Sequence, residues 1–483
     1  MSRYQNHKIT FGSPTSRPIP ISGLPFELLS EIFKVYAASD PKVLDRRVVD
    51  LCLVGKYWNT VANATPELWT KINLSLPSGH DHLTAATKRV HASKTEKIDV
   101  SIEFRYPKWD GEGKFHNGTG IAITNTVHGW VEKIMGVLNG TQPRWKSIRV
   151  VSDAWLPLHQ LMGAWTSKNP LSLESISMTW TTVNYGHSNV RFGPEEFDEP
   201  MTLFGLRPLK LRDLSLCGVH VNWNNICDRF QNLRKLELRN QTYDAGPSFE
   251  QFAEMLSSSP RLECLDVSGF CPERHTGPPP PADTTRRVPV VHLPTLKEFT
   301  FGWKNVELGC KFLGMFQIGS SLESLTLLDV RSGLACFQSR QSGERSWDRS
   351  SEWIFEGLHR LGIAAPRDER DVPPRPFICM RGVKRLKIVW TKARVAEVVE
   401  FLGILTGLED IKLGDVDNGV LNAVTKACVN RAREGLLRRV DLGWMWERER
   451  GREIPIFAKE PIQDLLKAGV EVSLNEVDRS EEW

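Results

Sequence analysis

The residue groups that could do chemistry are short and incomplete. Gly111, Gly113 and Lys114 fall short of a phosphate-binding loop, which needs a longer glycine spacing and a Ser or Thr after the lysine, so we expect a polar turn. His80 and His82 could share a metal ion, yet no further ligand stands near them at a recognisable spacing, and we expect a solvated loop. No serine sits in a nucleophile elbow, and no cysteine carries a family signature. These motifs favour an interaction protein, with no catalytic residue, metal or cofactor, over an enzyme. A hydrolase whose site is assembled from distant residues stays open as an alternative.

The cysteines and the charge of the chain indicate its cellular compartment and the classes of partner it can bind. The chain has 9 cysteines at scattered positions and no signal peptide, which predicts buried thiols in a reducing compartment, the cytoplasm or the nucleus. The formal net charge of +4 is small for 483 residues, and acidic residues interrupt the basic region from Arg431 to Arg452, so we expect no nucleic-acid partner. No apolar run is long enough to cross a bilayer, so we expect no membrane partner.

The segment Ile21–Trp69 has the pattern of three short helices that cannot bury all their apolar residues. Leu28 and Ile32 fall on one side of the first helix with Leu29 and Phe33 beside them, a stripe too wide for a lone surface helix. A unit of about fifty residues buries too little surface to be robust alone. The apolar excess therefore needs the rest of the chain or a partner.

The order of motifs in this segment resembles the F-box family. The matching residues are Leu24-Pro25, Glu27-Leu28, Ile32-Phe33, Leu51 to Val54, Lys56, Trp58, Ala62 and Pro66 to Trp69. The resemblance implies docking onto the small Skp adaptor and, through it, onto a cullin–RING ubiquitin ligase. It implies adaptor contacts by Leu24, Pro25, Leu28, Ile32, Phe33, Leu51, Val54 and Trp58. The alternative, an ordinary helical cap on the following domain, does not explain the order of the motifs.

A six-residue pattern recurs along the rest of the chain: apolar, two variable residues, apolar, one variable residue, apolar. Its eleven matches start at Trp145, Leu173, Leu211, Leu233, Leu262, Leu296, Leu322, Leu358, Val383, Leu408 and Leu437. Successive matches are 22 to 38 residues apart, which is close to the leucine-rich range. Each match is weak alone, but eleven at this spacing predict repeated structural units.

Helical patterns separate many of these matches, and Ser248 with Gln251 forms a capping-box pattern at the start of one of them. The predicted helices are Thr126–Leu138, Ser248–Leu256, Val395–Leu402, Val420–Cys428 and Pro461–Ala468. Strands that alternate with helices predict a parallel sheet with right-handed crossovers. Stacked units of this kind form a curved solenoid with strands inside and helices outside. Further strands are expected at Ile72–Leu76, Ile98–Ile102 and Val470–Val472.

The chain from Lys71 onward thus resembles the irregular leucine-rich repeats that often follow an F-box. The predicted fold class is α/β, with a three-helix F-box and then a right-handed leucine-rich-repeat-like solenoid. The predicted boundaries are 1–20 for a disordered tail, 21–70 for the F-box and 71–483 for the solenoid. Irregular stretches break the rhythm as loop insertions, which are either flexible or partner-binding, near 105–120, 184–200, 277–294, 338–351 and 365–376.

Two residue sets could bind a target protein. Trp180, Trp303, Trp390 and Trp444 each stand two residues after the last apolar position of a match, where other repeats carry turn residues. They form either a row of exposed rings along one rim or part of the packed interior. Arg239, Lys387 and Lys412 belong to the second set, the solvent-facing strand positions.

These features lead to the hypothesis of a substrate-recognition subunit of a Skp–cullin–F-box ubiquitin ligase. The F-box binds the Skp adaptor, and the solenoid binds a target protein that the sequence does not identify. The alternative is a non-catalytic solenoid scaffold whose F-box does not engage a ligase.

Overall fold

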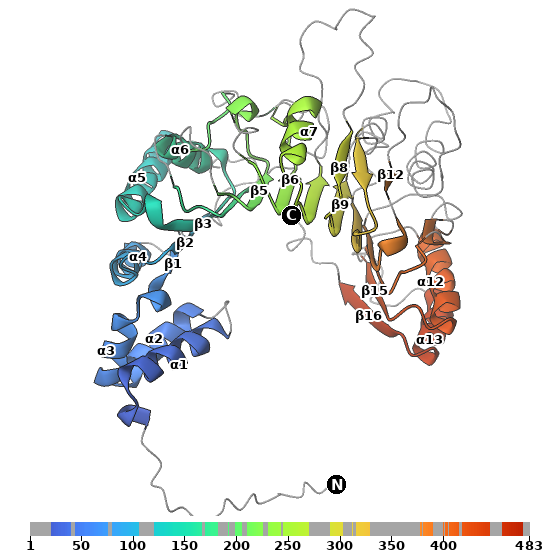
Figure 1. The fold of residues 1–483 in the computed structure, drawn as a ribbon, viewed down its shortest axis with the longest axis horizontal. Coiled ribbons are helices and arrows are strands. Elements are labelled where there is room, and N and C mark those ends of the chain that lie inside the picture. Colours follow the sequence, from blue (N-terminus) through green and yellow to red (C-terminus); the bar gives the residue numbers. More distant parts are fainter. Residues whose placement is uncertain are drawn as a thin grey trace, which may run out of the picture.

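The first helices of the chain form a small unit of their own. The computed structural model describes residues 21–39, 44–75, 80–105, 120–166, 170–181, 192, 199–204, 210–225, 230–242, 245–269, 290–302, 312, 315–328, 377–378, 380–389, 399, 401–403, 405–414, 418–444 and 456–476. Within it, the first helices are η1 (Ile21–Gly23), α1 (Phe26–Ala38), α2 (Leu44–Val54), α3 (Lys56–Ala64) and η2 (Pro66–Trp69). Their buried residues form a separate core of Leu29, Phe33, Ala37, Val48, Leu51, Val61, Ala62 and Leu68. These helices lie at one end of the molecule (Figure 1).

Thirteen strands of the described chain form one parallel sheet, so the predicted α/β fold with a large parallel sheet is confirmed. All thirteen lie in the sheet in the order in which they occur along the chain, and the numbers skipped in this order, β8, β10 and β12, belong to a second sheet. The strands are β1 (Lys71–Ser75), β2 (Ile98–Phe104), β3 (Trp145–Ser152), β4 (Ser175–Trp180), β5 (Asp213–Cys217), β6 (Lys235–Arg239), β7 (Cys264–Ser268), β9 (Glu298–Gly302), β11 (Ser324–Leu328), β13 (Arg385–Val389), β14 (Asp410–Gly414), β15 (Arg439–Trp444) and β16 (Glu471–Glu476).

The strand pairing stays in phase along the sheet, which keeps apolar side chains on one face. Leu236 of β6, for example, pairs with Leu214 of β5 and Leu265 of β7, and all three are buried. Because side chains alternate between the two faces of a strand, shifting the pairing register by one residue would move every buried side chain of that strand to the solvent face. The buried face continues as one apolar core from Ile72 of β1 to Leu442 of β15.

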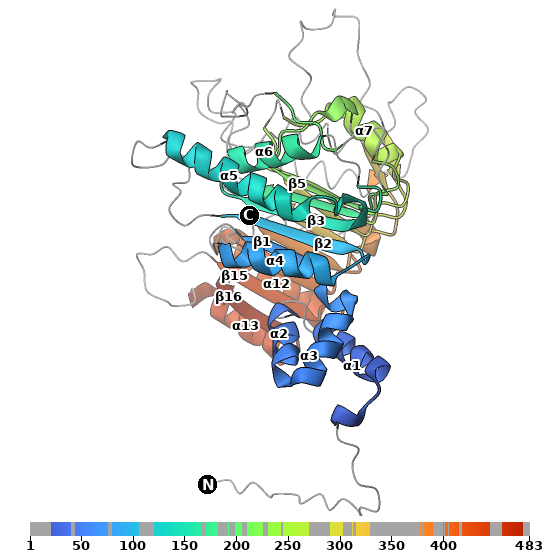
Figure 2. The same cartoon turned by 90° about the vertical axis from the view of Figure 1, so that its left-hand side faces the viewer.

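The helices cover the outer side of the curved sheet, and the strands line its inner side (Figures 1 and 2). They are α4 (His80–Ala92), α5 (Gly120–Leu138), α6 (Trp155–Trp165), α7 (Phe249–Ser257), α12 (Asn418–Arg433) and α13 (Ile456–Lys467), with short 3-10 turns η4 (Gln142–Arg144), η6 (Trp223–Asn225) and η7 (Met380–Gly382). Ser248 and Gln251 form the predicted capping box at the start of α7. None of the helices in the described residues combines the length and the apolar composition needed to span a bilayer.

Three sequence predictions are corrected by these elements. His80 and His82 lie in helix α4 and not in a loop, because Leu83, Ala86 and Val90 give this segment an apolar side that packs on the main core. The stretch 277–294 ends in a short strand, β8 (Val291–Leu293), which pairs with β10 (Phe316–Ile318). With β12 (Phe377–Ile378), these strands form a second parallel sheet.

The third correction concerns the repeat match at Leu358. Strand β11 pairs directly with β13, so this match does not supply a strand between them. The match itself, the predicted tail 1–20, the insertions 338–351 and 365–376, and most of 105–120 and 184–200 lie outside the described residues.

Candidate interaction surfaces

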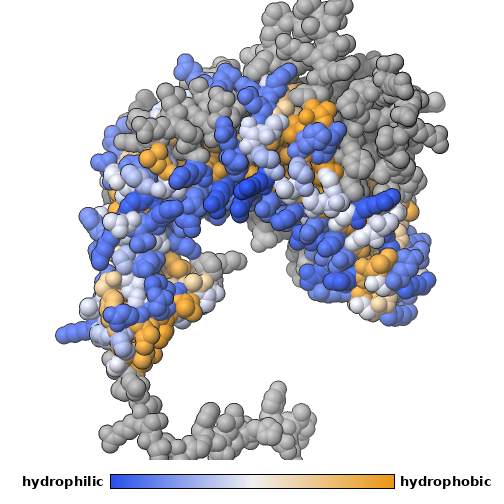
Figure 3. All heavy atoms as spheres, in the orientation of Figure 1, coloured by the Kyte–Doolittle hydropathy of each residue, from blue (hydrophilic) through white to orange (hydrophobic). Residues whose placement is uncertain are grey.

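An exposed apolar face covers α1, α2 and the start of α3, and it is visible at the lower left of Figure 3. We call this surface the helical apolar face. Its ten members are Ile21, Phe26, Leu28, Ile32, Val35, Tyr36, Val49, Leu53, Val54 and Tyr57. Elsewhere in the described chain, comparable exposure of large apolar residues is confined to Leu171, Val399, Leu436 and Leu466. Among the described residues, exposed large apolar side chains are therefore concentrated on η1 and the first three α-helices.

Helix periodicity explains how α1 can have a core and an exposed apolar face together. Leu29, Phe33 and Ala37 are four residues apart and lie on one side of the helix, where all three are buried. Leu28 and Ile32 follow the same spacing one residue earlier, and they are 54% and 44% exposed. The two stripes are adjacent, so α1 packs with one and presents the other to solvent.

Helix α2 repeats this division. Val48 and Leu51 are buried in the small core, whereas Val49, Leu53 and Val54 are exposed, Leu53 by 77%. Large apolar side chains with this exposure lose the favourable free energy of burial, about 1.5–3 kcal/mol for each side chain of this size. A partner that covers the face would recover part of it.

The residues that the F-box resemblance assigned to adaptor contact are divided by the structure. Pro25, Leu28, Ile32 and Val54 are exposed, and Leu24 and Trp58 are half-buried. Phe33 and Leu51 are buried in the small core, so these two side chains are not accessible to a partner in this conformation. Their role is to hold the helices together, and the ring of Phe33 lies 4.9 Å from that of Trp58.

Several members of the helical apolar face were not predicted as contact residues. Leu53, Val35 and Ile21 are the most exposed of them. The signal was present in the sequence, because Leu28, Ile32 and Val35 form a second apolar stripe beside the one that starts at Leu29. Sequence alone does not say which of two adjacent stripes faces the core.

Polar contacts fix the arrangement of the helices below this face. The hydroxyl of Tyr57 donates to the carbonyl of Leu24 at 3.0 Å, which ties the start of α3 to the start of α1. Ser30 and Thr65 share a buried hydrogen bond of 2.9 Å between their hydroxyls. The ammonium of Lys34 donates to the Glu67 carboxylate at 3.1 Å. These contacts link α1 and the residues before it with α3 and η2.

A cation–π contact joins the helical unit to the sheet. The Arg89 guanidinium of α4 lies 5.6 Å from the ring centre of Trp69 in η2, and its Nη1 donates to the carbonyl of Lys71 at 3.2 Å. Trp69 in turn donates its Nε1 hydrogen to the carbonyl of Ala62 in α3 at 2.8 Å. The three contacts connect α3, η2, α4 and the first strand.

The second candidate surface is the polar face of the sheet. The strand register places Arg149, Glu237, Asp266, Lys387, Lys412 and Asp441 in one row across the sheet. All were predicted to face solvent, and this is wrong for Asp266, which is buried. Lys387 and Lys412 are direct neighbours in this row. The ammonium of Lys412 lies 3.7 Å from the Asp441 carboxylate on the next strand.

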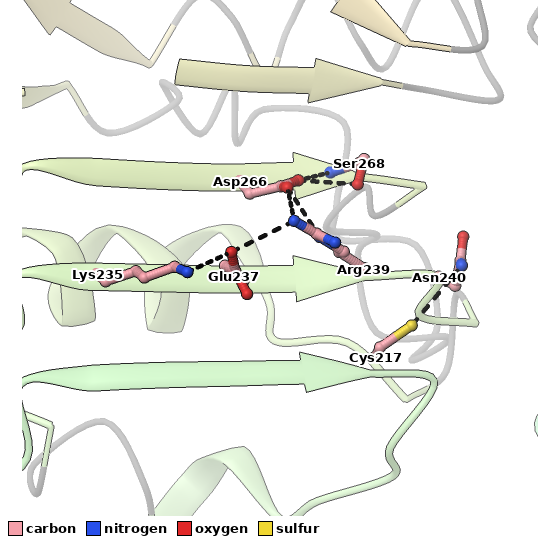
Figure 4. Close-up of polar contacts among 7 residues, drawn as sticks. All are labelled: Cys217, Lys235, Glu237, Arg239, Asn240, Asp266 and Ser268. Atoms are coloured by element: carbon pink, nitrogen blue, oxygen red, sulfur yellow. Dashed lines mark hydrogen bonds and ion pairs between the residues drawn. The ribbon is translucent and has the colours of Figure 1, made fainter. Parts of the chain in front are cut away.

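Arg239 belongs to an ionic cluster on this face (Figure 4). Its Nε donates to Oδ2 of Asp266 at 2.8 Å, and its Nη2 donates to Oε1 of Glu237 at 3.3 Å. Lys235 pairs with the same Glu237 oxygen at 2.9 Å, and Ser268 donates to Asp266 through its amide and its hydroxyl at 3.1 and 2.8 Å. The cluster therefore contains two cations and two anions in contact.

Burial and ion pairing act in opposite directions on the pKa values of this cluster. Burial raises the pKa of Asp266, although Arg239 and Ser268 act to lower it. Burial also acts to raise the pKa of Glu237, but Arg239 and Lys235 outweigh it and hold this pKa below its usual range. The difference follows from exposure, since Asp266 is almost fully buried.

Of the four tryptophans predicted as target-binding candidates, only Trp180 and Trp444 lie in the described residues. Trp180, the last residue of β4, is half-buried and packs against Trp155 and Phe192 at ring distances of 5.7 and 5.8 Å. Its Nε1 donates to the carbonyl of Asp153 at 3.3 Å. Trp444 ends β15, and Trp303 and Trp390 lie outside the described residues. The contacts of Trp180 favour packing over an exposed rim for that residue.

The cysteines of the described chain have the features of packed thiols. Cys217 and Cys428 are buried, and Cys52 and Cys264 are half-buried, all as free thiols. Burial raises the pKa of Cys217 to about 11 and those of Cys264 and Cys428 to about 12, which keeps these thiols protonated at neutral pH. In the same described residues, no group of three or more His, Cys, Asp or Glu side chains is placed to hold a metal ion.

Comparison with known proteins adds no assignment to these surfaces. No protein-family model matches the chain, and no curated protein matches it.

Proposed function

We propose that this protein is the substrate-recognition subunit of a Skp–cullin–F-box ubiquitin ligase. The observation that carries the proposal is the helical apolar face, which lies on the segment whose motif order resembles an F-box. In this proposal the face binds the Skp adaptor, and the sheet with its helices is a leucine-rich-repeat-like solenoid that binds a target protein.

The energetics of the helical apolar face support a docking role. Monomeric proteins in water rarely expose large contiguous apolar patches, and those that do usually bind a partner there. Leu28, Ile32 and Leu53 are exposed although Leu29 and Phe33 beside them are buried. The small unit already has a core of its own, so it can present this face without unfolding.

The shape of the molecule suits a subunit that holds two proteins together. The helical unit lies at one end of the curved sheet, and the strands of the sheet extend away from it (Figure 1). The contact between Arg89 and Trp69 links the two parts. A target held on the sheet would be kept near a ligase bound to the helices.

The mechanism in this proposal is proximity and needs no catalytic residue in this chain. A target bound to the same assembly as a charged ubiquitin conjugate meets it at an effective concentration set by the geometry of the assembly. The target lysine is then modified by the ligase and not by this chain. The polar face of the sheet, with charges of both signs from Arg149 to Asp441, favours a polar protein surface over a purely apolar ligand.

Copurification tests the proposal against the scaffold alternative. Tagged full-length protein, expressed in a eukaryotic cell, should bring down both the Skp adaptor and a cullin. A variant with Leu28→Ala and Ile32→Ala, which changes two exposed residues, should bring down neither. Absence of both partners from the wild-type sample would favour a scaffold that does not engage a ligase.

A further inference from the structure

Ten charged residues form a row along the edge where the strands begin. They are Lys146, Glu174, Arg212, Arg234, Glu263, Lys297, Glu323, Lys384, Glu409 and Arg438. Nine of them immediately precede a strand, and Lys146 is the second residue of β3. The amide of each donates to the carbonyl of the one before it at 2.7–2.9 Å, so the ten residues follow one another on neighbouring strands. We call this row the edge ladder.

The charges of the edge ladder alternate in sign with one exception. Basic and acidic residues follow each other from Glu263 to Arg438, and neighbouring side chains form ion pairs there, as in Lys297–Glu263 at 3.0 Å and Arg438–Glu409 at 3.1 Å. The exception is Arg212 beside Arg234, where two like charges stand on adjacent strands. Like charges directly opposite each other in a sheet are destabilising.

Among the described residues, no anion fully neutralises the positive charges of Arg212 and Arg234. Both are exposed, and neither forms an ion pair within the part of the chain that the structure describes. The neighbouring glutamates form their ion pairs with lysines, Glu174 with Lys97 at 2.8 Å and Glu263 with Lys297 at 3.0 Å, although Arg212 and Arg234 also help to lower the pKa of Glu174 and Glu263, respectively. Asp213 is close enough to act electrostatically on both arginines, but Lys235 acts on it as well.

Exposure gives the edge ladder a positive outer surface. All six basic members are exposed, whereas all four glutamates are half-buried. Lys210, two residues before Arg212, and Arg261, three residues before the start of β7, are exposed as well. The region around the pair therefore has four exposed cations on three neighbouring strand starts.

We propose that Arg212 and Arg234, with Lys210 and Arg261 beside them, bind an aspartate- or glutamate-rich segment of a partner protein. A guanidinium presents a planar fork of donors that matches a carboxylate, and two of them on adjacent strands, about 4.8 Å apart, can hold neighbouring carboxylates. The glutamates at the other ladder positions disfavour a nucleic acid, because its continuous row of phosphates would meet them. This site uses no residue of the helical apolar face, so it goes beyond the proposed function and does not depend on it.

A peptide-binding measurement tests the site on the full chain. The probe is a fluorescein-labelled peptide with four glutamates in a Gly-Ser background, and the readout is anisotropy at low and at physiological salt. The Arg212→Gln plus Arg234→Gln variant should bind it at least about tenfold more weakly than the wild type, which corresponds to about 1.4 kcal/mol. The matched control, Lys297→Gln plus Lys384→Gln, removes the same charge from ladder positions that lie between glutamates and should change binding by less than about threefold.

Three results would overturn the site. Equal weakening in both variants would mean that only the overall charge of the edge matters. Equal binding of a peptide with glutamines in place of the glutamates would exclude recognition of carboxylates. Tighter binding of a phosphoserine peptide or of a single-stranded oligonucleotide, with no binding of the glutamate peptide, would assign the arginines to phosphate. Adaptor binding and thermal melting of both variants should equal those of the wild type, which separates failure here from failure of the proposed function.

Discussion

The guanidinium of Arg239 lies against the carboxylate of Asp266 on the polar face of the sheet, with 2.8 Å between Nε and Oδ2. Asp266 is only 3% exposed although its neighbours in the row are open to solvent to a greater extent. Ser268 supplies two more donors to the same carboxylate. The sheet therefore holds an ion pair whose carboxylate is buried and whose guanidinium is partly exposed, and removal of the cation leaves a buried anion.

Replacing Arg239 by Met should destabilise the protein in a pH-dependent way. Removing one partner of a fully buried pair costs about 3–5 kcal/mol, and we expect about 1–3 kcal/mol here because the Arg239 side chain is 39% exposed and partly screened by solvent. Burial raises the pKa of Asp266 in the folded state, so its ionised form destabilises the fold above that pKa, and protonation at lower pH relieves the cost. The deficit of the variant against the wild type, measured by urea unfolding, should be large at pH 7.5 and should shrink towards pH 4.5.

Arg149→Met is the matched control for this prediction. Arg149 lies in the same row of the sheet but is exposed, and its replacement should change stability by less than about 0.5 kcal/mol. A deficit of the Arg239 variant that is small, or equal at both pH values, would show that the pair is not the buried electrostatic element described above.

Trp180 should contribute to stability and not mainly to target binding. It contacts Trp155 and Phe192, and its indole donates to Asp153. Because it is half-buried, Trp180→Ala should cost about 3 kcal/mol, the low end of the range for buried tryptophans. The melting temperature should fall markedly in a thermal scan, and an unchanged melting temperature with weaker target capture would return Trp180 to an exposed binding row.

The strands of the large sheet were easier to predict from the sequence than the short strands outside it. The repeated pattern located β3, β4, β5, β6, β7, β9, β11, β13, β14 and β15, because buried leucines at alternate positions are a local property of each strand. Helix α7 was also predictable, since Ser248 and Gln251 cap it. The short strands β8, β10 and β12 were not predicted, because two or three residues leave no period to detect.

In the candidate sites, too, the sequence does not predict side-chain features that depend on tertiary packing. The exposure of Leu28 and the burial of Phe33 depend on which stripe of α1 meets α2 and α3, and both stripes are equally apolar in sequence. The pairing of Arg212 with Arg234 depends on the register between β5 and β6, which is a tertiary relationship. Alternation within a single strand predicts the face of a residue but not its neighbour on the next strand.

The strands of the large sheet should behave as one cooperative stack. Strand β11 joins β9 on one side and β13 on the other, so a break after Leu328 would expose the buried Leu325 and Leu327 on one fragment and Leu386 and Ile388 on the other. Repeats of this kind are stabilised by their neighbours. Residues 1–328 and 377–483, expressed separately, should aggregate or lack a cooperative melt in size-exclusion and calorimetric measurements. Two soluble, cooperatively melting fragments would instead indicate separate domains.

The most direct test of the ligase proposal is the affinity of the purified chain for a purified Skp adaptor, measured by isothermal titration calorimetry. The wild type should bind, and Leu28→Ala with Ile32→Ala should weaken binding by about two orders of magnitude or more, because each removes an apolar anchor of about 2 kcal/mol. Both residues are exposed, so the melting temperature should stay the same. Leu171→Ala with Leu466→Ala, two leucines of similar exposure outside the helical apolar face, should bind like the wild type. No adaptor binding by the wild type, or unchanged affinity of the folded Leu28 and Ile32 variant, would contradict the proposal.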